Sequence, residues 1–227
     1  MAMEEGRKAG SEREASPERG ICEASSKVDP DGGVWDYPLG QSRRNDLPSF
    51  ALPSWAYSRR IGRAWIIREK EDAEGRRKIE CMVGVCWPLL LVTYALIITV
   101  TCFVFSKTLP KLSFVYTVAG CGLFFLVLTT LASTACRDPG IFPRHSTPKE
   151  EHWRWSEPAQ SFRPPGVVFC TANKVLVRDI DHFCPWTGTT IGQNNYCAFK
   201  LFLVSLFALL GYLGFVAIMG VSVSISP

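Results

Sequence analysis

Three side chains able to do covalent chemistry lie within four consecutive residues, in the segment 181–186, which reads Asp-His-Phe-Cys-Pro-Trp. A free cysteine has a pKa of about 8.5 and is mostly protonated at neutral pH. A histidine two positions away can accept the thiol proton, and an aspartate beside it can hold the imidazole in the useful tautomer. The segment therefore predicts Cys184 as a nucleophile, His182 as its general base and Asp181 as the group that orients His182. For an isolated tetrapeptide, the competing interpretation is a surface loop that carries only charge.

Three long uncharged segments flank these residues, because residues 81–106, 112–136 and 201–227 contain no Asp, Glu, Lys or Arg. Each is longer than the roughly 20 residues that a helix needs to cross a bilayer. Three such segments in 227 residues predict an α-helical multi-pass membrane protein with three transmembrane helices, at 81–106, 112–136 and 201–225. A small irregular domain, 137–200, lies between the second and third helices and holds the chemical residues. The uncharged spans argue against a channel or a transporter.

The basic residues indicate how the chain is oriented in the membrane. The connection between the first two spans offers only Lys107 and Lys111, whereas six basic residues approach the first span. By the positive-inside rule, the N-terminus and 137–200 are cytosolic. We expect a protein of the endomembranes (Golgi or endoplasmic reticulum) or of the plasma membrane. The six basic residues are Arg63, Arg68, Lys70, Arg76, Arg77 and Lys78.

The region before the first span divides into two parts. Residues 1–55 are rich in Glu, Arg, Ser, Gly and Pro and predict a disordered cytosolic tail. Residues 56–80 mix aromatic and basic side chains, which suits either a juxtamembrane segment lying on anionic lipid or a solvated linker. No signal peptide is expected, because the first apolar run begins only near residue 81. Within the first span, Pro88 predicts a kink.

The nine cysteines do not suggest a disulfide framework. Five lie in or at the edges of the predicted spans, where cysteine behaves as a small hydrophobic residue. Cys170, Cys184 and Cys197 lie in the segment expected in the reducing cytosol, where disulfides are rare. The five cysteines of the spans are Cys81, Cys86, Cys102, Cys121 and Cys136.

Short motifs flank the chemical segment in a definite order. Asp138-Pro139-Gly140 follows the second span, and Arg163-Pro164-Pro165 lies in the middle of the 137–200 domain. With 181–186, which matches five of six signature positions, these motifs resemble the DHHC family of protein S-acyltransferases (palmitoyltransferases). The resemblance extends over about residues 80–220 and continues toward the third span through Gly188, Ile191, Gly192, Asn195, Tyr196 and Phe199.

The resemblance implies a two-step transfer with palmitoyl-CoA as co-substrate. Cys184 would take the acyl group from the acyl-CoA and pass it to a cysteine of a membrane-associated protein. The expected partners are therefore acyl-CoA, such protein substrates and the lipid bilayer, with no nucleic acid. Arg137, Arg178 and Lys200 could contact the phosphates of CoA, or they could simply follow the positive-inside rule.

The resemblance also implies two structural zinc ions, yet most of the ligands are missing. The first site would fall on Ser156, Ala159, Phe169 and Leu176, and the second on Cys170, Asn173, Phe183 and Thr190. A structural zinc site needs four Cys or His ligands, and of these eight residues only Cys170 binds zinc well. We therefore expect no metal site in this chain.

Some other interaction must then hold the nucleophile, since structural zinc contributes on the order of 10 kcal/mol to a small domain. Phe169, Leu176 and Phe183, with nearby valines and isoleucines, predict a small apolar core in place of the metals. Burial contributes about 1.5–3 kcal/mol per large side chain. The other hypothesis is a loose, inactive segment.

The end of the sequence leaves two functions open. The family has a fourth span and a Thr-Thr-x-Glu motif beyond it, whereas this sequence ends at Pro227. We expect either a fragment or truncated copy, or a degenerate one. An S-acyltransferase is favoured by Asp181, His182 and Cys184. A catalytically inactive membrane adaptor descended from one is favoured by the missing ligands and the missing span.

Overall fold

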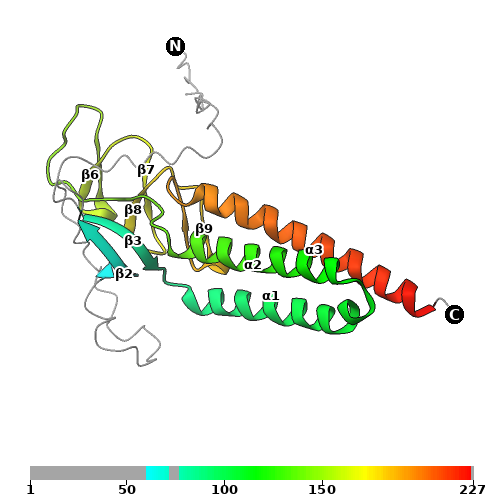
Figure 1. Ribbon diagram of the computed structural model, residues 1–227. Helices are drawn as coiled ribbons and strands as arrows, with labels where there is room; N and C mark the ends of the chain where they lie inside the picture. Colours follow the sequence, from blue (N-terminus) through cyan, green and yellow to red (C-terminus); the bar gives the residue numbers. More distant parts are fainter. Residues whose placement is uncertain (1–59, 72–76, 226–227) are drawn as a thin grey trace, which may run out of the picture.

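The computed structural model describes residues 60–71 and 77–225, and three long helices dominate it (Figure 1). They are α1 (Trp87–Thr108), α2 (Phe114–Cys136) and α3 (Tyr196–Ile225). A short 3₁₀ turn, η2 (Leu109–Lys111), joins α1 to α2. The tail expected to be disordered, 1–55, lies outside the described residues.

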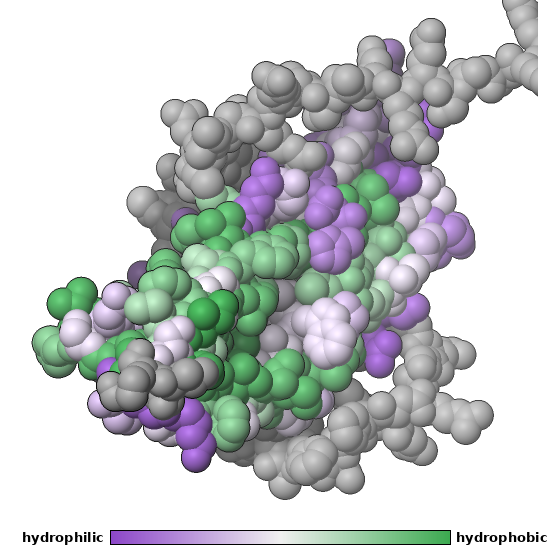
Figure 2. Space-filling view, turned by 90° about the vertical axis from the view of Figure 1, so that its right-hand side faces the viewer, coloured by the Kyte–Doolittle hydropathy of each residue, from purple (hydrophilic) through white to green (hydrophobic). Residues whose placement is uncertain are grey.

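All three helices are long and apolar enough to cross a membrane. Their outward side chains are large and hydrophobic, and in Figure 2 such residues gather over the helical bundle. Large apolar side chains exposed along a whole helix are stable in lipid but not in water. The chain is therefore a membrane protein with three candidate spans. Among these side chains are Leu96, Phe103, Phe125, Phe207 and Ile218, each more than 60% exposed.

Helix α2 packs mainly on α3. Val127 and Leu131 of α2 are fully buried in a cluster that includes Leu209 and Leu213 of α3. A hydrogen bond of 3.0 Å joins the hydroxyl groups of Thr130 and Ser205 across the two helices. A polar bond between apolar helices fixes their register, because in lipid an unpaired hydroxyl is unfavourable.

The first helix begins six residues later than the span expected at 81–106, because residues 81–83 belong to a strand. Strand β3 (Arg77–Val83) pairs with β2 (Ala64–Glu71), which also pairs with β1 (Arg60–Ile61). Hydropathy alone cannot separate the apolar end of a strand from a helix that follows it. Likewise, Pro88 does not kink α1 but lies in its first turn, where its missing N–H is not needed.

The described part of the segment expected at 56–80 belongs to an antiparallel sheet and is not a linker, while its position on lipid stays a prediction. Ile61, Ala64, Ile79 and Met82 are buried in one core with residues of the domain between α2 and α3. The backbone N–H of Arg63 donates to the Asn173 carbonyl at 2.8 Å, which joins the sheet to that domain. The sheet is thus part of the support for the chemical residues.

The segment between α2 and α3, which we call the β lobe (residues 137–195), is more regular than expected. Its described residues form seven short strands. Strands β7 (Val167–Cys170) and β4 (Ile141–Phe142) flank β8 (Val175–Arg178), while β5 (Arg154–Ser156) pairs with β6 (Ser161–Arg163). The last pair, β9 (His182–Cys184) and β10 (Thr189–Ile191), forms a hairpin just before α3. In Figure 1 the β lobe lies at the end of the bundle where α1 begins, α2 ends and α3 begins.

Candidate active site

The hairpin β9–β10 carries the chemical residues and divides its side chains between two faces. Cys184 pairs with Thr189, and His182 pairs with Ile191. Because side chains alternate along a strand, His182 and Cys184 share one face and Phe183 lies on the other. Because His182 and Cys184 are two positions apart on a strand, their Cα atoms are about 7 Å apart. At that separation the imidazole can reach the thiol.

His182 is held by contacts on two sides. Its Nδ1 atom lies 2.9 Å from Oδ2 of Asp181. Its ring also packs edge-on against Phe199 of α3, with 5.2 Å between ring centroids. When Nδ1–H donates to the carboxylate, Nε2 is left as the unprotonated atom that can accept a proton. The structure thus brings together the predicted base and its orienting group.

Cys184 is 8% exposed and is followed by a tight turn that lies against α1. The turn is η4 (Pro185–Thr187), and the Thr187 hydroxyl donates to the Cys184 carbonyl at 3.2 Å. The Thr93 hydroxyl of α1 donates to the Trp186 carbonyl at 2.9 Å. Thr93 lies six residues into α1, or about 9 Å along its axis. The nucleophile's loop is therefore level with the first two turns of a candidate span.

A close contact between backbones fixes this loop beside the start of α1. A Cβ atom added at Gly84 would lie 2.1 Å from the carbonyl oxygen of Gly188. Gly188 itself has φ of 74°, which favours glycine. Any larger residue at Gly84 would push the loop away, so both glycines are needed to position Cys184.

The junction between β10 and α3 is fixed by one buried amide. Asn195 accepts a hydrogen bond from the N–H of Gly192 at 2.9 Å. Its amide nitrogen donates to the carbonyls of Thr190 at 2.9 Å and Thr134 at 3.3 Å. One fully buried side chain thereby joins the hairpin to the last turn of α2.

The Asp-Pro-Gly motif forms a turn at the same junction. The Asp138 carboxylate accepts hydrogen bonds from the N–H groups of Gly140 and Ile141, both at 2.9 Å. Burial raises the pKa of Asp138, while these donors and the nearby Arg178 oppose the rise. In the Arg-Pro-Pro motif, Arg163 donates to the Val167 carbonyl and closes the turn between β6 and β7. Both motifs thus have structural roles around the hairpin.

The three basic residues proposed for phosphate binding lie at the ends of elements close to the bundle. Arg137 caps the C-terminus of α2, Lys200 lies over the Tyr196 ring in the first turns of α3, and Arg178 ends β8. The guanidinium of Arg178 lies 5.0 Å from the centroid of the Phe142 ring. Their role toward CoA stays a prediction.

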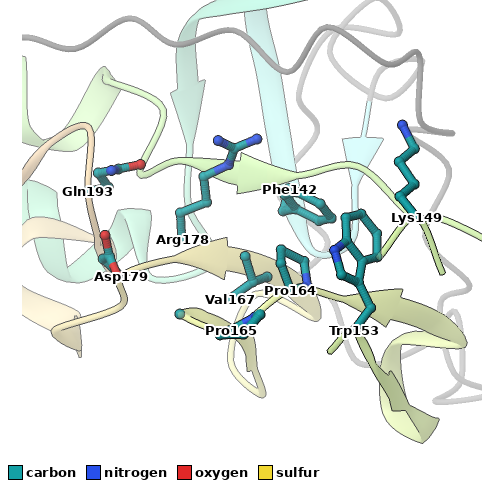
Figure 3. Close-up of a pocket in the computed structure, with 10 residues that line it drawn as sticks. Phe142, Lys149, Trp153, Pro164, Pro165, Val167, Arg178, Asp179 and Gln193 are labelled. Carbon is teal, nitrogen blue, oxygen red and sulfur yellow. The ribbon is translucent and has the colours of Figure 1, made fainter. Parts of the chain in front are cut away.

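Arg178 also lines a pocket of about 250 Å³ (Figure 3). Trp153 and Phe142 form its aromatic wall, and Lys149 lies at its edge. None of the three chemical residues lines this pocket. It is therefore a separate feature of the β lobe.

Comparison with known proteins relates the C-terminal third of the chain to one family. The model of the DHHC palmitoyltransferase family matches residues 149–226, which include the hairpin and all of α3. Over these residues the chain is similar to the DHHC palmitoyltransferase family. Palmitoyltransferase ZDHHC5-A of Danio rerio is 34% identical over 152 residues, 56% of this chain and 20% of that protein. Palmitoyltransferase ZDHHC8 of Mus musculus is 34% identical over 105 residues, 38% of this chain and 14% of that protein. The chain thus spans about a fifth or less of these curated relatives.

The first set of positions implied for zinc is mostly apolar. Phe169 of β7 pairs directly with Leu176 of β8. Ala159 and Leu176 are fully buried in one cluster, and Phe169 packs against it. Ser156 ends β5, three residues before Ala159. These four residues offer neither a thiol nor an imidazole, so they do not fit a structural zinc.

The second set does not fit zinc either, and it combines apolar packing with polar contacts. Cys170, Asn173 and Thr190 are buried, and the first two each contact the Thr190 hydroxyl through a polar atom. Only Phe183 adds an apolar side chain.

The apolar core expected from Phe169, Leu176 and Phe183 is present, because Leu176 is buried in one cluster and both phenylalanines pack against it. The polar contacts of the second set were not predicted. Among the described residues, no group of three or more His, Cys, Asp or Glu converges as metal ligands would.

Another thiol of the chain is chemically distinct. Burial, together with a hydrogen bond to Cys136, raises the pKa of Cys81 in β3 to about 11. A thiol with so high a pKa is almost wholly protonated at neutral pH, and the thiolate is the nucleophilic form. Cys81 is therefore a poor acceptor for an acyl group.

Two positioning residues could not be identified from the sequence. Thr93 is a polar residue in an apolar span, which was its only signal, and Gly84 is one of 18 glycines. The significance of each depends on what lies opposite it in the fold. By contrast, Asn195 belongs to the motif series, although its three hydrogen bonds were not predicted.

Proposed function

We propose that this chain is a protein S-acyltransferase that carries a long-chain acyl group on Cys184. The observation that carries the proposal is that His182, in contact with Asp181, lies on the same face of hairpin β9–β10 as Cys184, level with the start of α1. Acyl-CoA is the donor, and a cysteine of a membrane-associated protein is the acceptor. The names of the relatives, which are palmitoyltransferases, support the same chemistry.

In the first step, His182 Nε2 takes the proton of the Cys184 thiol as the sulfur attacks the thioester carbonyl. The C–S bond to CoA then breaks, and the departing CoA thiolate takes the proton from His182. The Asp181 carboxylate stabilises the imidazolium that forms between these events. The product is an S-acylated Cys184 and free CoA.

In the second step, the acceptor thiol gives its proton to His182 and attacks the acyl carbonyl on Cys184. The bond between the carbonyl and the Cys184 sulfur breaks, and the cysteine recovers its proton from His182. His182 is therefore unchanged after one cycle. The same base serves both steps because the two transfers are chemically alike.

The position of the hairpin supports a lipid substrate. A nucleophile at the first turns of α1 lies at the boundary of a candidate span, so an acyl chain can enter lipid while CoA stays in water. Trp186, 60% exposed beside Cys184, suits an interfacial position. In this proposal the β lobe is cytosolic and the three helices span the membrane.

Arg137, Arg178 and Lys200 are the proposed contacts for the phosphates of CoA. All three carry a positive charge at the end of the bundle that holds the hairpin. If they bind phosphates, replacing Arg178 by Gln raises the KM for acyl-CoA and leaves the KM for the acceptor unchanged. If the variant changed neither KM, Arg178 would have a structural role, such as its contact with the Phe142 ring, and no role toward CoA.

Labelling with a clickable palmitoyl-CoA analogue in purified protein tests the proposal. The intact chain should acquire a hydroxylamine-sensitive label that Cys184→Ser loses. His182→Ala should slow labelling by about 10²–10⁴-fold, the usual contribution of a general base. Cys102→Ser is the matched control, because Cys102 is an exposed thiol within α1. A label that persists in Cys184→Ser would indicate passive acylation elsewhere and would contradict the proposal.

A catalytically inactive membrane adaptor is the second candidate function. It is favoured by the two sets of zinc positions, which have lost all their ligands except Cys170. In that case the intact chain and His182→Ala would label at the same low rate, although the fold would be unchanged.

A further inference from the structure

The four positions of the second implied zinc site converge in space, although three have lost their metal ligands. Cys170 ends β7, and the backbone N–H of Lys174 donates to its carbonyl at 2.8 Å, closing a turn that contains Asn173. Phe183 and Thr190 are direct cross-strand partners in the hairpin. Directly paired residues project to the same side of a hairpin. Two of the four positions, Cys170 and Asn173, therefore lie at the turn, and the other two, Phe183 and Thr190, lie on the side of the hairpin that faces it.

Thr190 is the centre of these contacts. Its Oγ1 accepts a hydrogen bond from Asn173 Nδ2 at 2.8 Å and lies 3.1 Å from the sulfur of Cys170. Cys170 is 4% exposed, and the other two are fully buried. Phe183 packs against the cluster that contains Cys170. We call Cys170, Asn173 and Thr190 the polar trio.

The polar trio connects two units that no backbone ladder joins. The turn belongs to the sheet β4–β8–β7, and Thr190 belongs to the separate sheet β9–β10. A buried hydrogen bond is directional, and an unmade one leaves costly unpaired groups. It can therefore fix the distance and angle between the units, as four metal–ligand bonds would.

We propose that the polar trio replaces a metal centre and holds the hairpin that carries Cys184, while keeping the geometry of a tetrahedral site. On this basis, Asn173→Cys, Phe183→His and Thr190→Cys, together with the native Cys170, rebuild a Cys₃His zinc site. Three Cys and one His are an established ligand set for structural zinc. The inference concerns the support of the hairpin and does not require that the chain transfers acyl groups.

The hydrogen bonds are tested by exchange of the backbone amides of β9 and β10 in the full chain. Thr190→Val removes the hydroxyl and should speed exchange about tenfold, while Thr190→Ser keeps the hydroxyl and should restore protection. Thr189→Val is the matched control. Thr189 is equally buried in the same strand, but its hydroxyl has no hydrogen-bond partner among the described residues. Equal exchange in Thr190→Val and Thr189→Val would overturn the proposal.

The retained geometry is tested by titrating the triple variant with Co²⁺, whose tetrahedral thiolate complexes absorb visible light. We expect one tightly bound ion per chain, displaced by Zn²⁺, and protection of β9 and β10 that rises as metal is added. Adding Cys170→Ser removes one ligand and should weaken binding at least tenfold. Absence of a tetrahedral spectrum, in a triple variant whose helical content matches the intact chain, would contradict the proposal. Neither measurement depends on acyl transfer, so a failure here is distinct from a failure of the proposed function.

Discussion

The two sets of residues at the implied zinc positions replace metal ligands in different ways. Phe169 and Leu176 are neighbours in one strand pair, so packing of their side chains is enough to connect them. Cys170 and Thr190 belong to different sheets and are connected by polar atoms. Apolar packing is tolerant of direction, whereas a hydrogen bond is not. Residues that replace a metal within one sheet can therefore be apolar, whereas residues that orient two sheets need directional contacts.

The largest effect expected on stability comes from the apolar set. Leu176 is fully buried, and Leu176→Ala should lower the free energy of unfolding by about 2–5 kcal/mol. Leu176→Met keeps most of the volume and should cost less than about 1.5 kcal/mol. Thermal unfolding of the full chain in detergent, followed by limited proteolysis within 165–195, measures both.

If Leu176→Ala and Leu176→Met were equally unstable, volume would not be what matters at this position. The first set of zinc positions would then resemble the second set, in which hydrogen bonds between polar atoms hold the residues together. Rapid cleavage of the unmodified β lobe would instead favour the loose segment that the sequence left open.

The second prediction concerns backbone packing beside the nucleophile. Gly84→Ala places a methyl group about 2.1 Å from the Gly188 carbonyl oxygen, so the loop must move. Overpacking of this kind costs about 1–3 kcal/mol. We expect a lower unfolding temperature and faster reaction of Cys184 with a thiol reagent. Gly122→Ala is the control, since nothing lies within 4 Å of a Cβ added there. Unchanged Cys184 reactivity would show that the loop is held from elsewhere.

The sequence predicted those features of the site that depend on residues close to one another along the chain. The motif series predicted the family, and the uncharged runs predicted three helices. Once residues 182–184 are known to form a strand, the alternation of side chains predicts that His182 and Cys184 share one face and that Phe183 lies on the other. Thr93 and Gly84 could not be predicted, because their partners are more than 90 residues away. Asn173 appeared only as a missing ligand, since no sequence pattern indicates that it reaches Thr190.

A third, smaller effect is expected from a single hydrogen bond between α1 and the nucleophile's loop. Thr93→Val removes the donor to the Trp186 carbonyl and should cost about 1 kcal/mol. For a chain of this size that is a fall of about 2–4 °C in unfolding temperature. Thr129→Val is the matched control, because the Thr129 hydroxyl bonds only to carbonyls of its own helix. If both variants behaved alike, the bond to Trp186 would add nothing beyond a helical threonine.

The smallest effect is expected at the surface of the β1–β3 sheet. Glu80 lies 2.7 Å from Arg68 Nε and 2.8 Å from Lys70 Nζ, and the hydrogen bond with Lys70 is the main cause that lowers its pKa. A lowered pKa in the folded chain adds stability above the unfolded value of about 4.3, and this stability is lost as the pH falls through the folded pKa. The basic partners are largely exposed, however, so solvent screens the attraction.

Glu80→Gln should therefore unfold at the same temperature as the intact chain at pH 7, and also at a pH near 4. Differential scanning fluorimetry at two salt concentrations measures this. A fall as large as that of Thr93→Val at pH 7, disappearing as the pH is lowered, would mean that exposed polar contacts stabilise this chain as much as buried ones. Burial would then not be what gives the polar trio its strength, and the contrast between the two sets of residues would have to rest on geometry alone.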